Sequence, residues 1–156
     1  MVPVAIALGS NLGDRRLHLT TAVDALGAWL QDIRVSEFIE TPPEGVAPQP
    51  PFLNGALVAT SAASPAALLA TMLALERQAG RERPYPGAPR PLDLDLILFG
   101  SAVIDEPGLV VPHPRFRDRG FVLEPLASVA PDMIDPVTGK TVRELYQSWR
   151  GRHPCV

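Results

Sequence analysis

The sequence has very little cysteine and lysine, and each shortage excludes a class of protein. Cys155 is the only cysteine among 156 residues, so no disulfide can form within the chain. Lys140 is the only lysine, so the glycine-rich segment GSNLGD lacks the lysine that a P-loop needs. The net charge is only -3, which gives no overall field that favours nucleic acid or an anionic membrane. We therefore expect no nucleic-acid partner and no membrane association.

Long apolar runs are also absent. The opening VPVAIALG has no basic residue before it and is far shorter than the ~20 residues needed to cross a bilayer. We interpret it as a strand, and together with the single cysteine it predicts a cytoplasmic protein. With 46% hydrophobic residues the chain is long enough for one core, so we expect a single domain over residues 1–156.

Apolar periodicity divides the chain into alternating strands and helices. Strand patterns cover residues 4–8, 33–40, 52–61, 92–99, 102–104 and 109–111. Helices are expected after the caps Asp14, Ser64 and Thr141, the last running through Trp149, and in part over residues 120–129. The inward face of the first helix should comprise Leu19, Ala22, Val23, Leu26, Trp29 and Leu30. This order predicts an α+β fold with a ferredoxin-like βαββαβ core, a mostly antiparallel sheet covered by helices, and an added hairpin and C-terminal helix.

The segment PRPLDLDLILFG places two carboxylates on one strand. Alternation along the strand puts Asp93 and Asp95 on the same face, roughly 6 to 7 Å apart. The opposite face should hold Leu92, Leu94, Leu96 and Leu98. Two unpaired carboxylates so close together are costly unless a cation neutralises them, and Mg²⁺ prefers such oxygen ligands. The alternative is that the two acids pair with nearby arginines or lie in water at the strand end.

Basic residues gather around this acid pair in the sequence. Seven of the 14 basic residues lie between residues 77 and 119. Those nearest the pair, with one histidine, are Arg81, Arg83, Arg90, His113, Arg115, Arg117 and Arg119. Because arginine forks match phosphate oxygens, arginines around a metal-binding acid pair indicate a polyphosphate ligand. Phe52, Asn54 and Phe121 are suitable for a flat heterocycle, although each phenylalanine alone is more typical of a core.

Several motifs resemble one enzyme family over nearly the whole chain. They are IALGSNLGD, the strand ending in ETPP, PFLNGAL, ALERQAGRER, APRPLDLDLILFG, VPHPRFRDRGFVLEPL and the following APD. In this order they are similar to 6-hydroxymethyl-7,8-dihydropterin pyrophosphokinases of folate biosynthesis. The resemblance implies a monomeric transferase that moves pyrophosphate from ATP to the pterin hydroxymethyl group, releases AMP and uses two Mg²⁺ ions.

The same resemblance implies roles for individual residues. Asp93 and Asp95 would hold the two Mg²⁺ ions and act in catalysis with Arg81 and Arg90. The residues implied to bind ATP are Glu76, Arg81, Arg83, Arg90, His113 and Arg119. Phe52 and Phe121 would sandwich the pterin, Asn54 would read its edge, and Thr41 and Pro42 would form the rim of the pocket.

The chain departs from the family pattern at one loop. The loop that ends at Arg90 reads RPYPGAPR, and Tyr85 is its only aromatic residue. The family's loop usually contains a basic residue and a tryptophan, in a form like RWGPR, and is one residue longer. Glu44 and Pro114 also replace residues that are more common in the family. Two other functions stay open at this stage: a DxD-type nucleotidyltransferase that uses Mg²⁺, and a non-catalytic ferredoxin-like domain that binds a small molecule.

Overall fold

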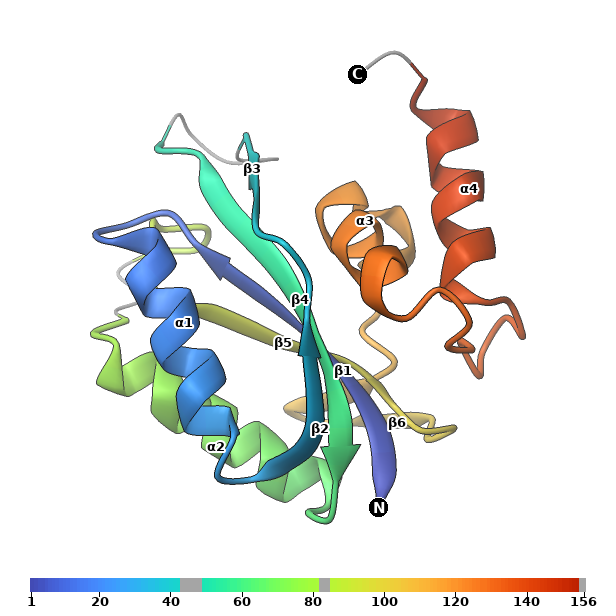
Figure 1. Ribbon diagram of the computed structural model, residues 1–156, viewed down its shortest axis with the longest axis horizontal. Coiled ribbons are helices and arrows are strands. Elements are labelled where there is room, and N and C mark those ends of the chain that lie inside the picture. The colour runs from blue at the N-terminus through green and yellow to red at the C-terminus, as the bar shows by residue number, and fades with distance from the viewer. Residues whose placement is uncertain (43–48, 82–84, 155–156) are drawn as a thin grey trace.

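The protein is described by a computed structural model that covers residues 1–42, 49–81 and 85–154 (Figure 1). In chain order the elements are β1 (Val2–Ser10), α1 (Arg15–Leu26), β2 (Leu30–Val35), β3 (Ile39–Thr41), β4 (Phe52–Ser61), α2 (Pro65–Gln78), β5 (Asp93–Phe99), β6 (Ile104–Glu106), β7 (Leu109–Val111), the short 3-10 helix η1 (Phe116–Asp118), α3 (Gly120–Val129) and α4 (Val142–Arg152). No helix in these described ranges has the length and apolar character of a membrane span.

One antiparallel sheet organises the fold. Its strand order is β2-β4-β1-β5, with the short β3 also paired to β4, and β6 and β7 form a separate hairpin. Antiparallel pairing in this order, with α1 and α2 in the crossovers, is the ferredoxin-like βαββαβ arrangement. The predicted fold class, hairpin and C-terminal helix are therefore confirmed.

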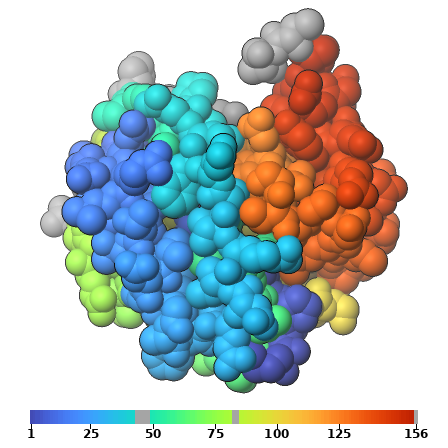
Figure 2. Space-filling view, in the orientation of Figure 1, coloured from blue at the N-terminus to red at the C-terminus, as the bar shows by residue number. Residues whose placement is uncertain are grey.

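Helices cover both faces of the sheet and create two hydrophobic cores (Figure 1). On one face, Ile6, Leu8 and Leu94 pack with side chains of α1 and α2. On the other face, Ala5 and Ala56 pack with side chains of α3 and α4. Figure 2 shows the N-terminal part of the chain in blue and cyan beside the orange and red surface of α3 and α4.

The expected helix caps form as the sequence indicated. The Asp14 carboxylate accepts a hydrogen bond from the Leu17 amide, and the Ser64 hydroxyl accepts one from the Ala67 amide. Thr141 forms a reciprocal capping box with Glu144 at the start of α4. Each cap satisfies amide groups that the first turn of a helix leaves without a partner, which fixes where each helix begins.

Other expectations were wrong in detail. Helix α1 ends at Leu26, so Trp29 is 55% exposed instead of inward, and Leu30 begins β2. The expected strand over 33–40 is two strands, β2 and β3, and the expected strand over 102–104 is β6, shifted toward the C-terminus. Helical spacing continued past the true helix end because Leu30 is buried in a strand, which periodicity alone does not distinguish.

A β-bulge in β5 changes which face its last residues occupy. Ile6 of β1 pairs with Leu96, but the neighbouring Ala5 pairs with Leu98, so Ile97 is the extra residue. Leu98 therefore packs in the core under α3 and α4, and the prediction that it shares a face with Leu94 and Leu96 was wrong. Asp93 and Asp95 precede the bulge and keep the alternation expected for them.

Candidate active site

The acid pair lies on the sheet face that α3 covers, at the start of β5. Asp93 pairs across the sheet with Gly9, and Asp95 pairs with Ala7, both on β1. A Cβ atom on Gly9 would lie 3.1 Å from the Asn54 Oδ1 atom and 3.8 Å from the Asp93 Cβ atom. Because glycine and alanine stand beside the two carboxylates, the surface between Asp93, Asp95 and Asn54 stays open to a ligand.

Asp93 takes part in an ion-pair network that connects three elements of the chain. Its Oδ1 atom accepts a hydrogen bond from Arg81 Nη1 at 2.7 Å, and its Oδ2 atom lies 3.4 Å from Arg90 Nε. The same Arg81 Nη1 atom donates to Glu76 Oε2 at 2.7 Å, and the Leu94 amide donates to that oxygen at 2.8 Å. Asp93 thus pairs with arginines, which was the alternative that the sequence left open for the acid pair.

Glu76 reaches this network from the buried face of α2. It follows Leu68 and Met72 at helical spacing, and the whole residue is 3% exposed. Glu76 therefore joins α2 to β5 through the Leu94 amide and holds Arg81 against Asp93. The sequence placed Glu76 near a nucleotide, and the structure places it behind the arginine that faces the acid pair.

Asp95 has a different environment from Asp93. Burial, followed by the negative charge of Asp93, raises the pKa of Asp95 to about 7. Among the described residues, His113 is the basic side chain within 4 Å of Asp95, and its Nε2 atom lies 3.9 Å from Asp95 Oδ1. Burial and the positive charge of Arg119 lower the pKa of His113 to about 4, so this histidine is neutral at pH 7 and the contact is not an ion pair there. A cation bound nearby would therefore favour the charged form of Asp95.

A cleft of about 610 Å³ opens beside the acid pair. Its lining residues are Thr41, Pro42, Phe52, Asn54, Arg90, Asp93, Arg115, Asp118, Arg119 and Phe121. All five residues that the sequence proposed for pterin binding are among them. Asp95 lies next to this cleft, in a small recess that it shares with Asp93, Asn54 and Phe121. The structure thus brings together residues that are separated by up to 80 positions in the chain.

Two aromatic rings in the cleft come from opposite layers of the fold. Phe52 begins β4 in the sheet, and Phe121 lies in the first turn of α3. The Arg90 guanidinium carbon lies 4.9 Å from the Phe52 ring centre, and that of Arg119 lies 5.6 Å from the Phe121 ring centre. Asn54 is 5% exposed and donates a hydrogen bond from its amide nitrogen to the Thr41 hydroxyl. The cleft can therefore hold a flat polar ring beside anionic groups.

Three further residues near the cleft show where the expected basic cluster agrees with the structure and where it does not. Arg115 belongs to the expected basic cluster and lines the cleft, but Asp118 also lines it and no sequence pattern indicated this. Arg117 was expected in the same cluster, and the structure pairs it instead with the buried Asp135. The side chains of Arg115 and Arg119, on either side of η1, face the cleft, and the side chain of Arg117 within η1 does not. Arg83 lies outside the described residues.

Asn11 connects the loops around the cleft. Its side chain is 1% exposed, its Oδ1 atom accepts from the Arg90 amide at 2.8 Å, and its Nδ2 atom donates to Gln49 Oε1 at 2.5 Å. The side-chain amide nitrogen of Gln49, Nε2, donates to the Gly87 carbonyl at 2.9 Å. The segment GSNLGD, in which no phosphate-binding lysine was found, therefore holds the backbone of Arg90 in place.

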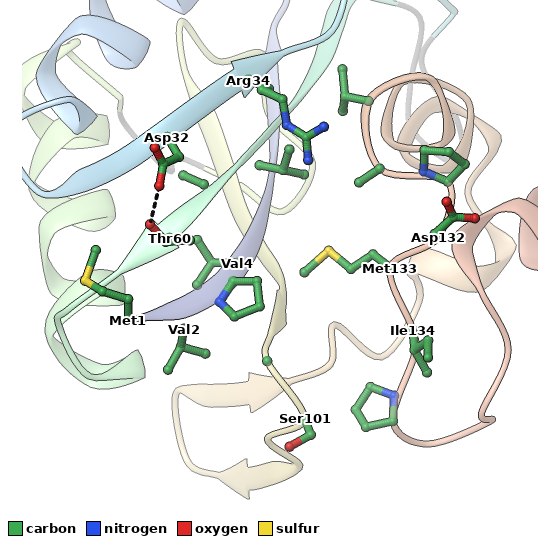
Figure 3. Close-up of a pocket in the computed structure, with 18 residues that line it drawn as sticks. Met1, Val2, Val4, Asp32, Arg34, Thr60, Ser101, Asp132, Met133 and Ile134 are labelled. Carbon is green, nitrogen blue, oxygen red and sulfur yellow. Dashed lines mark hydrogen bonds between the residues drawn. The ribbon is translucent and has the colours of Figure 1, made fainter.

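A larger cavity lies elsewhere. It has a volume of about 1080 Å³ and includes Met1, Arg34, Ser101 and Met133, at the end of the sheet where β1 begins and β5 has ended (Figure 3). None of the site residues expected from the sequence lines it. The chemistry expected of the acid pair therefore belongs to the smaller cleft.

Comparison with known proteins identifies the family. The family model for 7,8-dihydro-6-hydroxymethylpterin-pyrophosphokinase (HPPK) matches residues 5–131. A 2-amino-4-hydroxy-6-hydroxymethyldihydropteridine pyrophosphokinase of Synechocystis is 40% identical over 144 residues, which are 91% of this chain and 73% of that protein. The Pseudomonas aeruginosa enzyme of the same name is also 40% identical over 144 residues, covering 91% of this chain and 88% of its own.

Solved structures agree on the fold. The crystal structure of wild-type Plasmodium falciparum HPPK-DHPS superposes with a TM-score of 0.76 at 16% identity, over 97% of this chain. This chain spans 45% of that protein's length, so the similarity concerns one part of a larger protein. The chain belongs to the 7,8-dihydro-6-hydroxymethylpterin-pyrophosphokinase family.

Proposed function

We propose that the protein transfers pyrophosphate from ATP to the hydroxymethyl group of 6-hydroxymethyl-7,8-dihydropterin and releases AMP, as a step of folate biosynthesis. Family membership supports this activity. The observation that carries it is the convergence of an acidic strand end, arginines and two aromatic rings on one cleft. All of these residues come from a single chain, which supports the proposal that the protein acts as a monomer.

Phe52, Phe121 and Asn54 form the pterin end of the proposed site. A flat ring held between Phe52 of β4 and Phe121 of α3 would stack on both of its faces, each contact contributing ~0.5–1.5 kcal/mol beyond the area buried. Because the Asn54 amide nitrogen already donates to the Thr41 hydroxyl, its Oδ1 atom and its second N–H group are oriented for the polar edge of the ring. Thr41 and Pro42 close the side of this compartment.

The arginines form the phosphate end. Arg90 and Arg119 line the cleft, and Arg81 stands behind Asp93. Their guanidinium groups would bind the triphosphate and stabilise the charge that develops on it during transfer. His113 is neutral at pH 7 and adjoins Asp95, so we assign it a hydrogen bond to a phosphate oxygen and not a charge contact. Glu76 would act through Arg81, whose guanidinium it fixes.

Asp93 and Asp95 are suitable ligands for Mg²⁺. They supply oxygen atoms, and the repulsion that raises the pKa of Asp95 would be relieved by a cation. Asp93 can keep its bond to Arg81, because a carboxylate offers about four acceptor positions. We propose that this pair holds the two Mg²⁺ ions expected with ATP, which would neutralise phosphate charge.

The transfer requires position more than a protein nucleophile. The pterin hydroxyl oxygen attacks the β-phosphorus of ATP and loses its proton, and the bond from that phosphorus to the bridging oxygen of the α-phosphate breaks, so AMP leaves. The chain's contribution is to hold the pterin between two rings and the triphosphate on arginines so that the hydroxyl is in line with the β-phosphorus. Such positioning accounts for several kcal/mol of a barrier in general.

An isotope experiment tests the proposal and separates it from the two other candidate functions. ATP labelled either at the α- or at the γ-phosphorus is incubated with Mg²⁺ and 6-hydroxymethyl-7,8-dihydropterin. A pyrophosphokinase puts the γ-label on the pterin and the α-label in AMP. A nucleotidyltransferase would put the α-label on the acceptor and release labelled pyrophosphate from γ-labelled ATP, and a non-catalytic binding domain would leave ATP intact. Either of the last two results would overturn the proposal.

A further inference from the structure

A carboxylate outside the cleft is completely buried. Asp135 is 0% exposed and lies in the segment between α3 and α4. Its Oδ2 atom accepts from Arg117 Nε at 2.6 Å and its Oδ1 atom from Arg117 Nη2 at 2.9 Å, which is a bidentate pair. The function proposed above uses neither residue.

The turn that carries Asp135 also fixes its carboxylate, independently of Arg117. The Thr138 hydroxyl donates to Oδ2 at 2.7 Å, and the Val137 amide donates to Oδ1 at 3.1 Å. In the main chain, the Asp135 amide donates to the Lys140 carbonyl at 2.9 Å, and the Gly139 amide donates to the Asp135 carbonyl at 2.8 Å. Burial alone would raise the pKa of Asp135, but bonds from Arg117, Thr138 and Val137 outweigh it and lower that pKa. The pair is therefore charged and rigid at neutral pH.

Arg117 lies between two arginines that face the cleft. Arg115 precedes it and Arg119 follows it around the three-residue helix η1, and both line the cleft. Within the described residues, neither side chain forms a hydrogen bond or an ion pair with the protein, although Arg119 lies over the Phe121 ring. The backbone of η1 therefore sets where both side chains leave the chain, and the ring of Phe121 is the contact that further orients Arg119.

Two side chains of η1 help to hold that backbone, beside a 3.4 Å hydrogen bond from Arg152 Nη2 to the Arg117 carbonyl. The Phe116 ring is 0% exposed in the core under α3 and α4, and the Arg117 side chain extends away from the cleft to Asp135. A buried ion pair is weak evidence for stability in general, because desolvation offsets the attraction. A charge pair that costs desolvation energy but fixes the orientation of a backbone segment is suited to a site where the orientation of side chains affects ligand binding.

We infer that Asp135 is a positioning residue, which acts through Arg117 to aim Arg115 and Arg119 at the phosphate end of the cleft. This inference rests on the proposed function, since it assigns to the two arginines an anionic phosphate ligand. It adds a residue that touches neither substrate and lies on a different segment from every site residue named above.

The test compares matched variants in Mg-ATP binding by calorimetry and in steady-state AMP formation. Asp135→Asn keeps the size of the side chain but removes the charge and one acceptor of the fork, and should weaken ATP affinity or lower kcat/KM for ATP by about tenfold or more. Binding of a pterin by the protein alone should change by less than about threefold, because Phe52 and Asn54 lie on β4 and Phe121 belongs to helix α3, not to η1. Arg117→Gln should produce the same split, and the double variant should lose little beyond either single change.

Asp132→Asn is the control. It removes an aspartate–arginine pair in the same segment, with Arg143 at 2.9 Å, but the Asp132 side chain is 80% exposed and lines the far cavity (Figure 3). Its ATP parameters should stay within about twofold of the wild type. If Asp135→Asn or Arg117→Gln does not fold, Arg117→Lys, which keeps the charge without the fork, is judged by the same criterion.

The outcomes are distinct. If the folded variants lose thermal stability while ATP affinity and kcat/KM stay within about twofold of the wild type, the pair is only structural and the inference is wrong. Equal losses for ATP and for the pterin would also contradict it, because they would indicate a general disturbance. If the wild-type protein itself forms no AMP and binds no ATP, the proposed function fails instead.

Discussion

Glu76 offers a prediction whose size follows from the structure. The residue is 3% exposed, and one of its carboxylate oxygens accepts from both Arg81 at 2.7 Å and the Leu94 amide at 2.8 Å. Glu76→Ala leaves a buried amide without its acceptor, which costs ~1–3 kcal/mol, and breaks one half of a buried ion-pair network. Breaking a buried pair costs ~3–5 kcal/mol when the remaining charge is uncompensated, but Arg81 keeps Asp93. We expect a loss of about 3–5 kcal/mol for both effects together.

The matched variant Glu76→Gln should be much milder. Glutamine can still accept from the Leu94 amide and from Arg81, so only the charge-assisted part is lost, about 1–2 kcal/mol. Since a domain is stable by about 5–15 kcal/mol, the alanine variant should lose a large share of its stability and the glutamine variant a small one. Glu124→Ala, an exposed glutamate on α3, should stay within about 0.5 kcal/mol of the wild type.

Urea unfolding followed by tryptophan fluorescence measures these differences as free energies of unfolding. A cost of less than about 1 kcal/mol for Glu76→Ala, or an equal cost for Glu76→Gln and Glu76→Ala, would contradict this prediction. The first result would mean that water or another acceptor replaces Glu76, and the second that its charge and not its hydrogen bonds supports β5.

Two other changes follow from particular contacts. The pKa of Asp95 is raised from 3.8 to about 7, so the folded protein holds this proton more tightly than the unfolded chain and the contribution to stability falls as pH rises from about 4 to 7. The pKa of His113 is lowered from 6.5 to about 4, so its contribution to stability rises with pH between about pH 4 and 6.5 and opposes that of Asp95. Comparison of the wild type with Asp95→Asn isolates the Asp95 contribution. The variant's advantage in free energy of unfolding should grow toward pH 7, and a constant difference would contradict this. Gly120→Ala should destabilise the protein by about 1–3 kcal/mol in thermal unfolding, because its Cβ would overlap the Trp149 ring; an unchanged melting temperature would mean that Trp149 moves freely.

Much of the fold could be predicted from the sequence because local signals and tertiary structure agree. Ser64 followed by Pro65 marks the start of α2, and Gly80 with φ of +89° follows its end. Strand alternation placed Asp93 and Asp95 on one face, where the structure has them next to Gly9 and Ala7. These features depend on residues that are close together in the chain.

What the sequence did not predict depends on contacts between distant segments. The bulge at Ile97 exists because β5 must match β1, and no pattern within β5 signals it. The partner of Arg117 is 18 residues away, so its basic neighbours made it look like a phosphate ligand. Asp118 carries no signal at all, and Asn11 shows only as part of a glycine-rich turn.

The most direct test of the account is AMP formation by Asp95→Ala with Mg²⁺, ATP and 6-hydroxymethyl-7,8-dihydropterin, beside the wild-type protein. Removal of a desolvated carboxylate should leave the thermal unfolding temperature unchanged or raised, while turnover falls below detection. A folded Asp95→Ala protein that forms AMP at a rate near that of the wild type would contradict the role assigned to the acid pair.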